Sequence, residues 1–241
     1  MLYKNKIKVQ NILKSAVALM LMLTLSLSTA LSPLAKAEEA KYTWKTLTSV
    51  PGTRMKEIYI SPDGSKLFIQ EEDSSHNSSL WMSADDGATW RKIFSKQTTI
   101  EFVSISAGGS KIVLGNLGTS HFYMSTDGGQ SWTENQNNGV VSPIISPDGS
   151  FLVSCSGGSG TTYTTYISTD NGQTWTQKGT NNVSCAGYAS NNGALIAQGN
   201  NGDLAKSTDY GQTWTETPGV LNYDRPQSYS NDGNNIFDGD R

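Results

Sequence analysis

The sequence predicts an all-β fold, a β-propeller of four-stranded antiparallel blades that follows an N-terminal signal peptide. Three observations predict it: two turn motifs recur along the chain, short apolar runs of strand length flank each turn, and no apolar period of 3.6 residues appears after residue 40. A chain of 241 residues with 36% hydrophobic residues and two cysteines is typical of a folded globular protein, unlike collagen or a disulfide-stapled miniprotein.

The first 37 residues have the composition of a secretory signal peptide. They contain five lysines and no acidic residue, and the apolar run from residue 16 to residue 31 is too short to span a bilayer. The small-x-small sequence Ala35-Lys36-Ala37 places the expected cleavage between Ala37 and Glu38. An uncleaved membrane anchor is the alternative. We therefore expect a secreted or cell-surface protein with no stable membrane insertion after cleavage.

The expected mature chain, residues 38–241, is acidic. Removal of the signal peptide leaves 13 basic and 21 acidic residues, which gives a net charge of about −8. Such a surface repels phosphate, so we do not expect nucleic acid as a partner. An exported chain can keep a disulfide, so Cys155 and Cys185 are either a disulfide pair or two buried free thiols.

The stronger of the two repeats is an octapeptide with the template Ser-x-Asp-x-Gly-x-x-Trp. Its four copies begin 42, 43 and 39 residues apart. A fixed period of this size predicts a repeat architecture in which each unit is one small sheet. The template positions are Ser83, Asp85, Gly87 and Trp90; Ser125, Asp127, Gly129 and Trp132; Ser168, Asp170, Gly172 and Trp175; and Ser207, Asp209, Gly211 and Trp214.

A second turn motif alternates with the octapeptide. SPDGS at Ser61 returns as SAGGS, SPDGS, SNNGA and SNDGN, in steps of 45, 40, 44 and 40 residues. Runs rich in β-branched and aromatic residues flank these turns, so each repeat holds four strands, as a propeller blade does. The expected blades are residues 55–94, 100–135, 140–178 and 183–217, with a partial fifth at 223–241 and residues 41–47 as a candidate closing strand. The alternative to this five-blade ring is a truncated larger ring.

The residue types of the octapeptide suit a tight hairpin. Glycine tolerates positive φ, and the aspartate carboxylate can accept hydrogen bonds from the N–H groups of the turn. The serine hydroxyl can bond that carboxylate or the backbone, and we expect the tryptophan ring to be buried over the turn. The octapeptide template offers a metal ion only one carboxylate, so we expect neither a metal site nor catalysis there.

The four octapeptides resemble Asp-box repeats, also called bacterial neuraminidase repeats. These repeats recur in sialidases, in xyloglucan-cleaving endoglucanases, in sortilin-type receptors and, in weaker form, in photosystem II assembly-factor-like propellers. The resemblance covers about residues 41–241. It implies a β-propeller but no single activity, because these families share the box and differ in chemistry.

The resemblance to sialidases implies a set of catalytic groups that the sequence does not supply. A sialidase needs three arginines for the substrate carboxylate, a tyrosine nucleophile assisted by a glutamate, and an aspartate acid/base. The mature chain has four arginines in total, and Arg91 directly follows a box tryptophan. The Phe-Arg-Ile-Pro signature is absent, and Pro51-Gly52-Thr53-Arg54 is the nearest sequence to it. We therefore assign no catalytic residue.

Ligand binding is expected on the face opposite the boxes. In a four-stranded antiparallel blade the box hairpins share one end, and the connections at the other end are mostly Gly, Ser, Thr and Asn. Two charged clusters stand out there, in what we expect to be two long loops; solvated loop charge is the alternative interpretation. The candidate ligand-face residues are Arg54, Glu71, Glu72, His76, Tyr223, Asp224 and Arg225.

These observations favour a secreted, non-catalytic propeller that binds a carbohydrate or an extracellular protein through its polar loop face. We expect no cofactor and no metal. The alternative is a sialidase-like glycoside hydrolase, truncated or inactive, and the sequence does not identify the ligand.

Overall fold

The computed structural model describes residues 46, 50–51, 54–116, 121–136, 141–157, 163–181, 183, 187–198, 203–218, 228–229 and 236–237. The chain divides into two units, residues 1–46 and 47–241, and the strands of the described residues lie in the second. The expected signal peptide, its cleavage residues Ala37 and Glu38, and the candidate closing strand except for residue 46 lie outside the described residues. No helix in the described part of the chain is long and apolar enough to cross a membrane.

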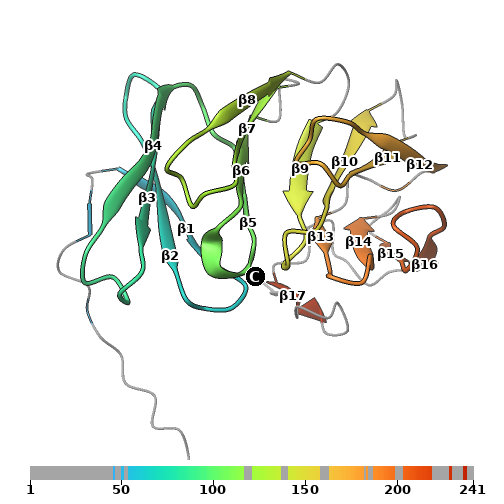
Figure 1. Ribbon diagram of the computed structural model, residues 1–241. Helices are drawn as coiled ribbons and strands as arrows, with labels where there is room; N and C mark the ends of the chain where they lie inside the picture. The colour runs from blue at the N-terminus through green and yellow to red at the C-terminus, as the bar shows by residue number, and fades with distance from the viewer. Residues whose placement is uncertain are drawn as a thin grey trace, which may run out of the picture. The chain divides into compact units, whose positions relative to one another are not determined.

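Within the described residues, four antiparallel sheets of four strands each are followed by a two-stranded sheet (Figure 1). In every sheet the strands pair in chain order, as in a propeller blade. The all-β prediction, with four full blades and a partial fifth, is confirmed. The blades are β1 (Met55–Ile60), β2 (Leu67–Glu72), β3 (Asn77–Ser83) and β4 (Arg91–Gln97); β5 (Phe102–Ile105), β6 (Ile112–Gly115), β7 (His121–Ser125) and β8 (Thr133–Gln136); β9 (Val141–Ile145), β10 (Leu152–Gly157), β11 (Tyr163–Ser168) and β12 (Thr176–Asn181); β13 (Tyr188–Ala189), β14 (Leu195–Gln198), β15 (Leu204–Ser207) and β16 (Thr215–Thr217); and the pair β17 (Ser228–Tyr229) and β18 (Ile236–Phe237). A short 3-10 turn, Ala107–Gly109, joins β5 to β6.

The hydrophobic core is divided among the spaces between consecutive blades. Phe68 and Leu80 of the first blade pack with Ile112 of the second, and all three side chains are fully buried. Similar clusters join the second blade to the third and the third to the fourth. Every residue of β6 is buried, as expected for a strand whose two faces both meet other sheets. The apolar runs of the sequence thus supply both faces of a blade.

The two turn motifs lie at one end of each blade. The SPDGS-type turn joins the first two strands of each full blade, and the octapeptide joins the last two. Because the four strands are antiparallel and pair in chain order, both hairpins turn at the same end of the sheet. The connections between the second and third strands, and those between blades, lie at the other end.

Two of the SPDGS-type turns contain a serine–aspartate hydrogen bond that the sequence pattern did not lead us to expect. Ser61 Oγ donates to Asp63 Oδ1 at 2.7 Å and accepts from the backbone N of Lys66 at 2.9 Å. In the third blade, Ser146 Oγ donates to Asp148 Oδ1 at the same distance. Both serines are buried, so each hydroxyl is held by its turn rather than by water.

Hydrogen bonds between neighbouring turns connect the blades at this end. The backbone N of Ala107 donates to Pro147 O at 2.5 Å, which joins the second blade to the third. Lys111 Nζ donates to Asn171 Oδ1 at 2.8 Å across the same boundary. The backbone N of Asp148 donates to Asn191 Oδ1 at 2.7 Å, which joins the third blade to the fourth. The turns therefore fasten blades to one another as well as closing their own hairpins.

Cys155 lies buried on β10 of the third blade. It takes part in a disulfide bond, so it is not a free thiol. Its expected partner, Cys185, lies outside the described residues.

Candidate functional site

The four octapeptides adopt one repeated hydrogen-bonded geometry. In the first, Ser83 Oγ donates to Asp85 Oδ1 at 2.8 Å and accepts from the backbone N of Gly87 at 2.9 Å. Asp85 Oδ1 also accepts from the backbone N of Thr89 at 2.8 Å, and Oδ2 accepts from the Thr89 hydroxyl at 2.6 Å. The same set of contacts recurs in Ser125, Asp127, Gly129 and Ser131; in Ser168, Asp170, Gly172 and Thr174; and in Ser207, Asp209, Gly211 and Thr213.

These hydrogen bonds keep the box carboxylates ionised. Donation from the Thr89 and Thr174 side chains, followed by donation from their backbone N–H groups, lowers the pKa of Asp85 and Asp170 to about 2. The remaining two boxes show the same lowering of pKa, to about 2 at Asp127. A carboxylate with so low a pKa carries no proton to donate near neutral pH. The geometry of the boxes is that of a structural turn.

The box glycines serve both the turn and the contact between blades. Gly129 and Gly172 have φ of 80° and 85°, which favours glycine. A Cβ on Gly172 would lie 2.6 Å from the Phe122 ring of the preceding blade, and one on Gly129 would lie 2.7 Å from Ile93. Gly87 and Gly211 also have positive φ.

The box tryptophans are only half-buried, so the prediction that their rings are buried was wrong. Each tryptophan immediately precedes the last strand of its blade, where no further strand of the same sheet covers the ring. Trp90, Trp175 and Trp214 donate their indole N–H to the glycine carbonyl of their own box at 3.2 Å. Trp132 differs, because it donates to Ile93 O in the preceding blade at 2.7 Å.

A cleft of about 520 Å³ lies at the other end of the first blade, away from the boxes. It is formed by the start of β1 and the connections that follow β2 and β4. Three of the expected ligand-face residues, Arg54, Glu72 and His76, line it. Its full lining is Arg54, Met55, Lys56, Glu72, Asp73, Ser74, His76 and Thr99.

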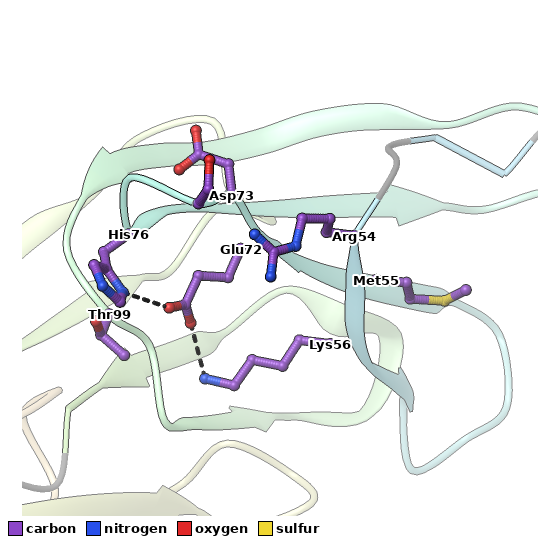
Figure 2. Close-up of a pocket in the computed structure, with 8 residues that line it drawn as sticks. Arg54, Met55, Lys56, Glu72, Asp73, His76 and Thr99 are labelled. Carbon is purple, nitrogen blue, oxygen red and sulfur yellow. Dashed lines mark hydrogen bonds and ion pairs between the residues drawn. The ribbon is translucent and has the colours of Figure 1, made fainter.

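Glu72 forms ion pairs with two of the basic residues that line the cleft. Its Oε2 accepts from Lys56 Nζ at 3.0 Å and its Oε1 lies 2.9 Å from His76 Nδ1 (Figure 2). Lys56 Nζ also donates to Ile100 O at 2.8 Å. The hydrogen bond from His76 and then that from Lys56 lower the pKa of Glu72. Both oxygens of this carboxylate are therefore occupied.

Asp73 is held within the turn that follows β2. Its Oδ1 accepts from the backbone N of Ser75 at 2.8 Å and from that of Asn77 at 2.9 Å. Its Oδ2 accepts from Asn77 Nδ2 at 2.7 Å. The hydrogen bond from the Asn77 side chain, followed by that from its backbone N–H, lowers the pKa of Asp73. This carboxylate stays charged and fixed in place.

The predicted long loop around Glu71, Glu72 and His76 was wrong. β2 extends through Glu72 and β3 begins at Asn77, because the hydrogen bonds of Asp73 close a tight turn between them. Successive side chains of a strand point to opposite faces. Glu71 therefore faces away from Glu72 and accepts from Trp81 Nε1 at 3.1 Å, and it is not among the residues that line the cleft.

Arg54 forms no ion pair among the described residues, although its guanidinium is in the cleft. Figure 2 shows its side chain extending from the start of β1 toward Glu72 and Asp73, whereas Met55 points away. The positive charge of Arg54 also lowers the pKa of Asp73, although by less than the hydrogen bonds of that carboxylate do. The other expected cluster, Tyr223, Asp224 and Arg225, lies outside the described residues.

The octapeptides match a known repeat family. The family model of the BNR/Asp-box repeat matches residues 123–134 and 166–177, which contain the second and third boxes. The chain has the fold of a β-propeller, and its second and third boxes match the Asp-box repeat, so we refer to it as the Asp-box propeller. No curated protein matches this Asp-box propeller significantly.

Solved structures with a similar fold include enzymes and a peptide-binding protein. The GH74 enzyme of Niastella koreensis is 26% identical, with a TM-score of 0.50 over 69% of the Asp-box propeller and 24% of the enzyme. An oligogalacturonate lyase in complex with manganese is 12% identical, with a TM-score of 0.54 over 69% of the Asp-box propeller and 54% of the lyase. YCF48 bound to D1 peptide is 17% identical, with a TM-score of 0.50 over 73% of the Asp-box propeller and 58% of YCF48. The Asp-box propeller thus spans less than two thirds of each of these chains, and the last two show the fold alone.

Proposed function

We propose that the Asp-box propeller is an exported, non-catalytic binding module that receives an anionic group of a glycan or an extracellular protein in the Arg54 cleft. One observation carries the proposal: Arg54 has no ion pair within the described residues, while the carboxylates beside it are already hydrogen-bonded.

A carboxylate is the ligand group that fits this arrangement best. A guanidinium binds a carboxylate through two parallel hydrogen bonds, which give both affinity and orientation. Glu72 is compensated by Lys56, so its charge opposes an incoming anion less than a free carboxylate would. Ser74 and Thr99 line the same cleft and offer hydroxyl groups to neutral parts of a ligand.

The state of the cleft carboxylates supports binding without catalysis. A glycoside hydrolase needs one carboxyl group whose pKa is raised, so that it can protonate the leaving oxygen. The pKa values of Glu72 and Asp73 are both lowered by their hydrogen bonds. Neither side chain has the properties of a general acid.

The structural relatives support a ligand of either class. One relative is a GH74 enzyme, and YCF48 is solved with a bound peptide. The apolar N-terminal segment and the acidic mature sequence support export and argue against nucleic acid as the ligand. N-terminal sequencing of the secreted protein tests the export step, and the expected first residue is Glu38.

The binding proposal is tested by calorimetric titration with hexagalacturonate and with a hexaglutamate peptide. Maltohexaose and a hexaglutamine peptide serve as their neutral counterparts. We expect at least one acidic probe to bind and the neutral probes to show no binding that depends on Arg54, and we expect Arg54→Gln to weaken binding of the acidic probe about 10-fold or more. Lys178→Gln, which removes a positive charge from β12, is the matched control. Equal binding of acidic and neutral probes would overturn the proposal.

A glycoside hydrolase is the second candidate, favoured by the 26% identity to the GH74 enzyme. Fluorogenic glucosides and sialosides test it directly. Turnover that disappears in Tyr223→Phe would replace the binding proposal with a catalytic one.

A further inference from the structure

A second hollow lies between the first and second blades, separate from the Arg54 cleft. This groove has a volume of about 280 Å³ and lies where the outermost strand of the first blade meets the second blade. It is lined chiefly by Phe94, Ser95 and Lys96 from β4 and by Tyr123, Trp132 and Glu134 from the second blade. We refer to it as the interblade groove.

Three aromatic rings form the apolar surface of the interblade groove. The Phe94 ring centroid lies 5.1 Å from that of Tyr123 and 5.1 Å from that of Trp132, with interplanar angles of 54° and 70°. Phe94 is buried, whereas Tyr123 and Trp132 are half-buried and keep part of their rings exposed. The Trp132 indole N–H is already bonded to Ile93 O, so the free surface of this ring is apolar.

The sequence of β4 explains why Trp132 differs from the other box tryptophans. β4 carries Ile93-Phe94 after its box, whereas the corresponding positions of β8 are Asn135-Gln136 and those of β12 are Lys178-Gly179. Among the described blades, only this pair places an aromatic ring of the last strand beside the tryptophan of the next blade. Trp175 instead meets Phe122 of β7, with ring centroids 6.3 Å apart. In the described boxes that lack this preceding pair, the tryptophan bonds to its own glycine. The contact of Phe94 with Trp132 is therefore particular to the first boundary among those described, whereas a hollow at the boundary between the third and fourth blades is lined by Phe151, Lys178 and Tyr210 instead.

Polar groups border this aromatic surface and converge on Glu134. Lys96 Nζ lies 2.6 Å from Glu134 Oε2 and 4.5 Å from the Tyr123 ring centroid. Glu134 Oε1 accepts from Tyr123 Oη at 3.4 Å and lies 3.4 Å from His121 Nδ1. Because the charges of Lys96 and Glu134 compensate each other, the groove offers hydrogen-bond donors and acceptors without a net charge.

We propose that the interblade groove binds a neutral β-linked glucan. A glucose ring with equatorial hydroxyls presents flat C–H faces, which stack on aromatic rings such as the exposed part of Trp132. Its hydroxyls both donate and accept, so they fit a carboxylate beside an ammonium group. A volume of 280 Å³ lies near the lower end of small-ligand sites, about 300 Å³, and accommodates a short segment of such a chain.

The test uses cellohexaose as the probe, with saturation-transfer NMR to detect contact and calorimetry to measure affinity. Wild-type protein should bind cellohexaose, and Trp132→Leu should weaken binding about five-fold or more because the stacking surface is lost. Trp175→Leu is the matched control, since it removes the equivalent tryptophan at a boundary where the last strand of the preceding blade carries no aromatic residue after its box. We expect the control to lower the melting temperature without changing the affinity.

Two further variants distinguish binding in the interblade groove from binding elsewhere on the protein. Glu134→Ala should weaken cellohexaose binding about three-fold or more, because a hydrogen-bond acceptor is lost. Arg54→Gln should leave cellohexaose binding unchanged, so a failure of the Arg54 proposal is distinguishable from a failure here. Absence of saturation transfer, equal losses in Trp132→Leu and Trp175→Leu, tighter binding of hexagalacturonate at this groove, or loss of binding in Arg54→Gln would each overturn the proposal.

Discussion

The serine of each Asp box is almost fully buried, although it lies in a turn at the end of a blade. The four box serines have exposures of 1%. In the third box, Ser168 Oγ donates to Asp170 Oδ1 at 2.8 Å and accepts from the backbone N of Gly172 at 2.8 Å. A buried hydroxyl with one donated and one accepted hydrogen bond is difficult to replace, because both partners lose their contact at once.

Ser168→Ala should lower the free energy of unfolding by about 1–3 kcal/mol, the usual cost of leaving a buried polar group without its partner. Chemical denaturation followed by tryptophan fluorescence measures the change. Thr169→Ala is the control, since it removes a hydroxyl from the neighbouring exposed residue, and it should change stability by less than about 0.5 kcal/mol. A Ser168→Ala protein as stable as this control would contradict the role of the box serine.

The box aspartates predict how stability depends on pH. The pKa of Asp170 is about 2 in the folded protein, below the value of about 3.9 for an aspartate in an unfolded chain. Its contribution to stability is therefore complete above about pH 4 and is lost as the pH falls toward 2. Asp170→Asn should lose less stability than wild type between pH 5 and pH 2, as measured by urea unfolding. Parallel curves for the two proteins would be inconsistent with an ionised Asp170 that stabilises its turn.

At the scale of the element, a box hairpin must fit both its own turn and the blade before it. Gly172 illustrates the two demands, because its φ is 85° and a Cβ there would lie 2.6 Å from the Phe122 ring. Gly64, in the first SPDGS-type turn, has φ of 72° but no heavy atom within 4 Å of the corresponding Cβ position. The two glycines differ in packing but not in backbone conformation.

Gly64→Ala should cost about 1–2 kcal/mol, the penalty of a left-handed conformation. Gly172→Ala should cost at least about 1 kcal/mol more, because the added methyl group also pushes against a buried aromatic ring. The comparison of the two unfolding free energies isolates the contact between blades. Equal costs would show that the box glycine serves its turn alone.

The sequence predicted the turns well where their hydrogen bonds join residues close together in the chain. The octapeptide determines its own turn, because serine, aspartate and glycine all act within five residues of one another. The hydrogen bond from Trp132 to Ile93 was not predictable in this way, since it depends on a phenylalanine 38 residues earlier in the chain. The connection after β2 is a tight turn rather than the predicted long loop, because Asp73 accepts Asx-type hydrogen bonds from the backbone N of Ser75 and of Asn77.

At the scale of the whole molecule, the disulfide at Cys155 is the covalent link within the repeat array. Cys155 is buried on β10, and the chain contains one other cysteine. A disulfide also agrees with the export that we propose, because secreted proteins fold under oxidising conditions. The sequence left both the bridge and two free thiols open, because spacing does not give the distance between two cysteines.

A reducing agent should lower the free energy of unfolding by about 2–4 kcal/mol, the typical contribution of a disulfide. Peptide mapping without reductant should recover Cys155 joined to Cys185. Cys155→Ala should be less stable than wild type and should not respond to the reductant. A wild-type melting temperature that is the same with and without reductant would contradict a stabilising bridge.

Across the whole molecule, the end of the blades that stabilises the fold is separate from the end that we propose binds the ligand. Parallel measurement of affinity for the acidic probe and of unfolding free energy in Ser168→Ala and Arg54→Gln tests this separation most directly. We predict that Ser168→Ala unfolds more easily but binds as wild type does, and that Arg54→Gln keeps its stability and loses affinity about 10-fold or more. A folded Ser168→Ala protein that has lost binding, or an Arg54→Gln protein that binds as tightly as wild type, would contradict it.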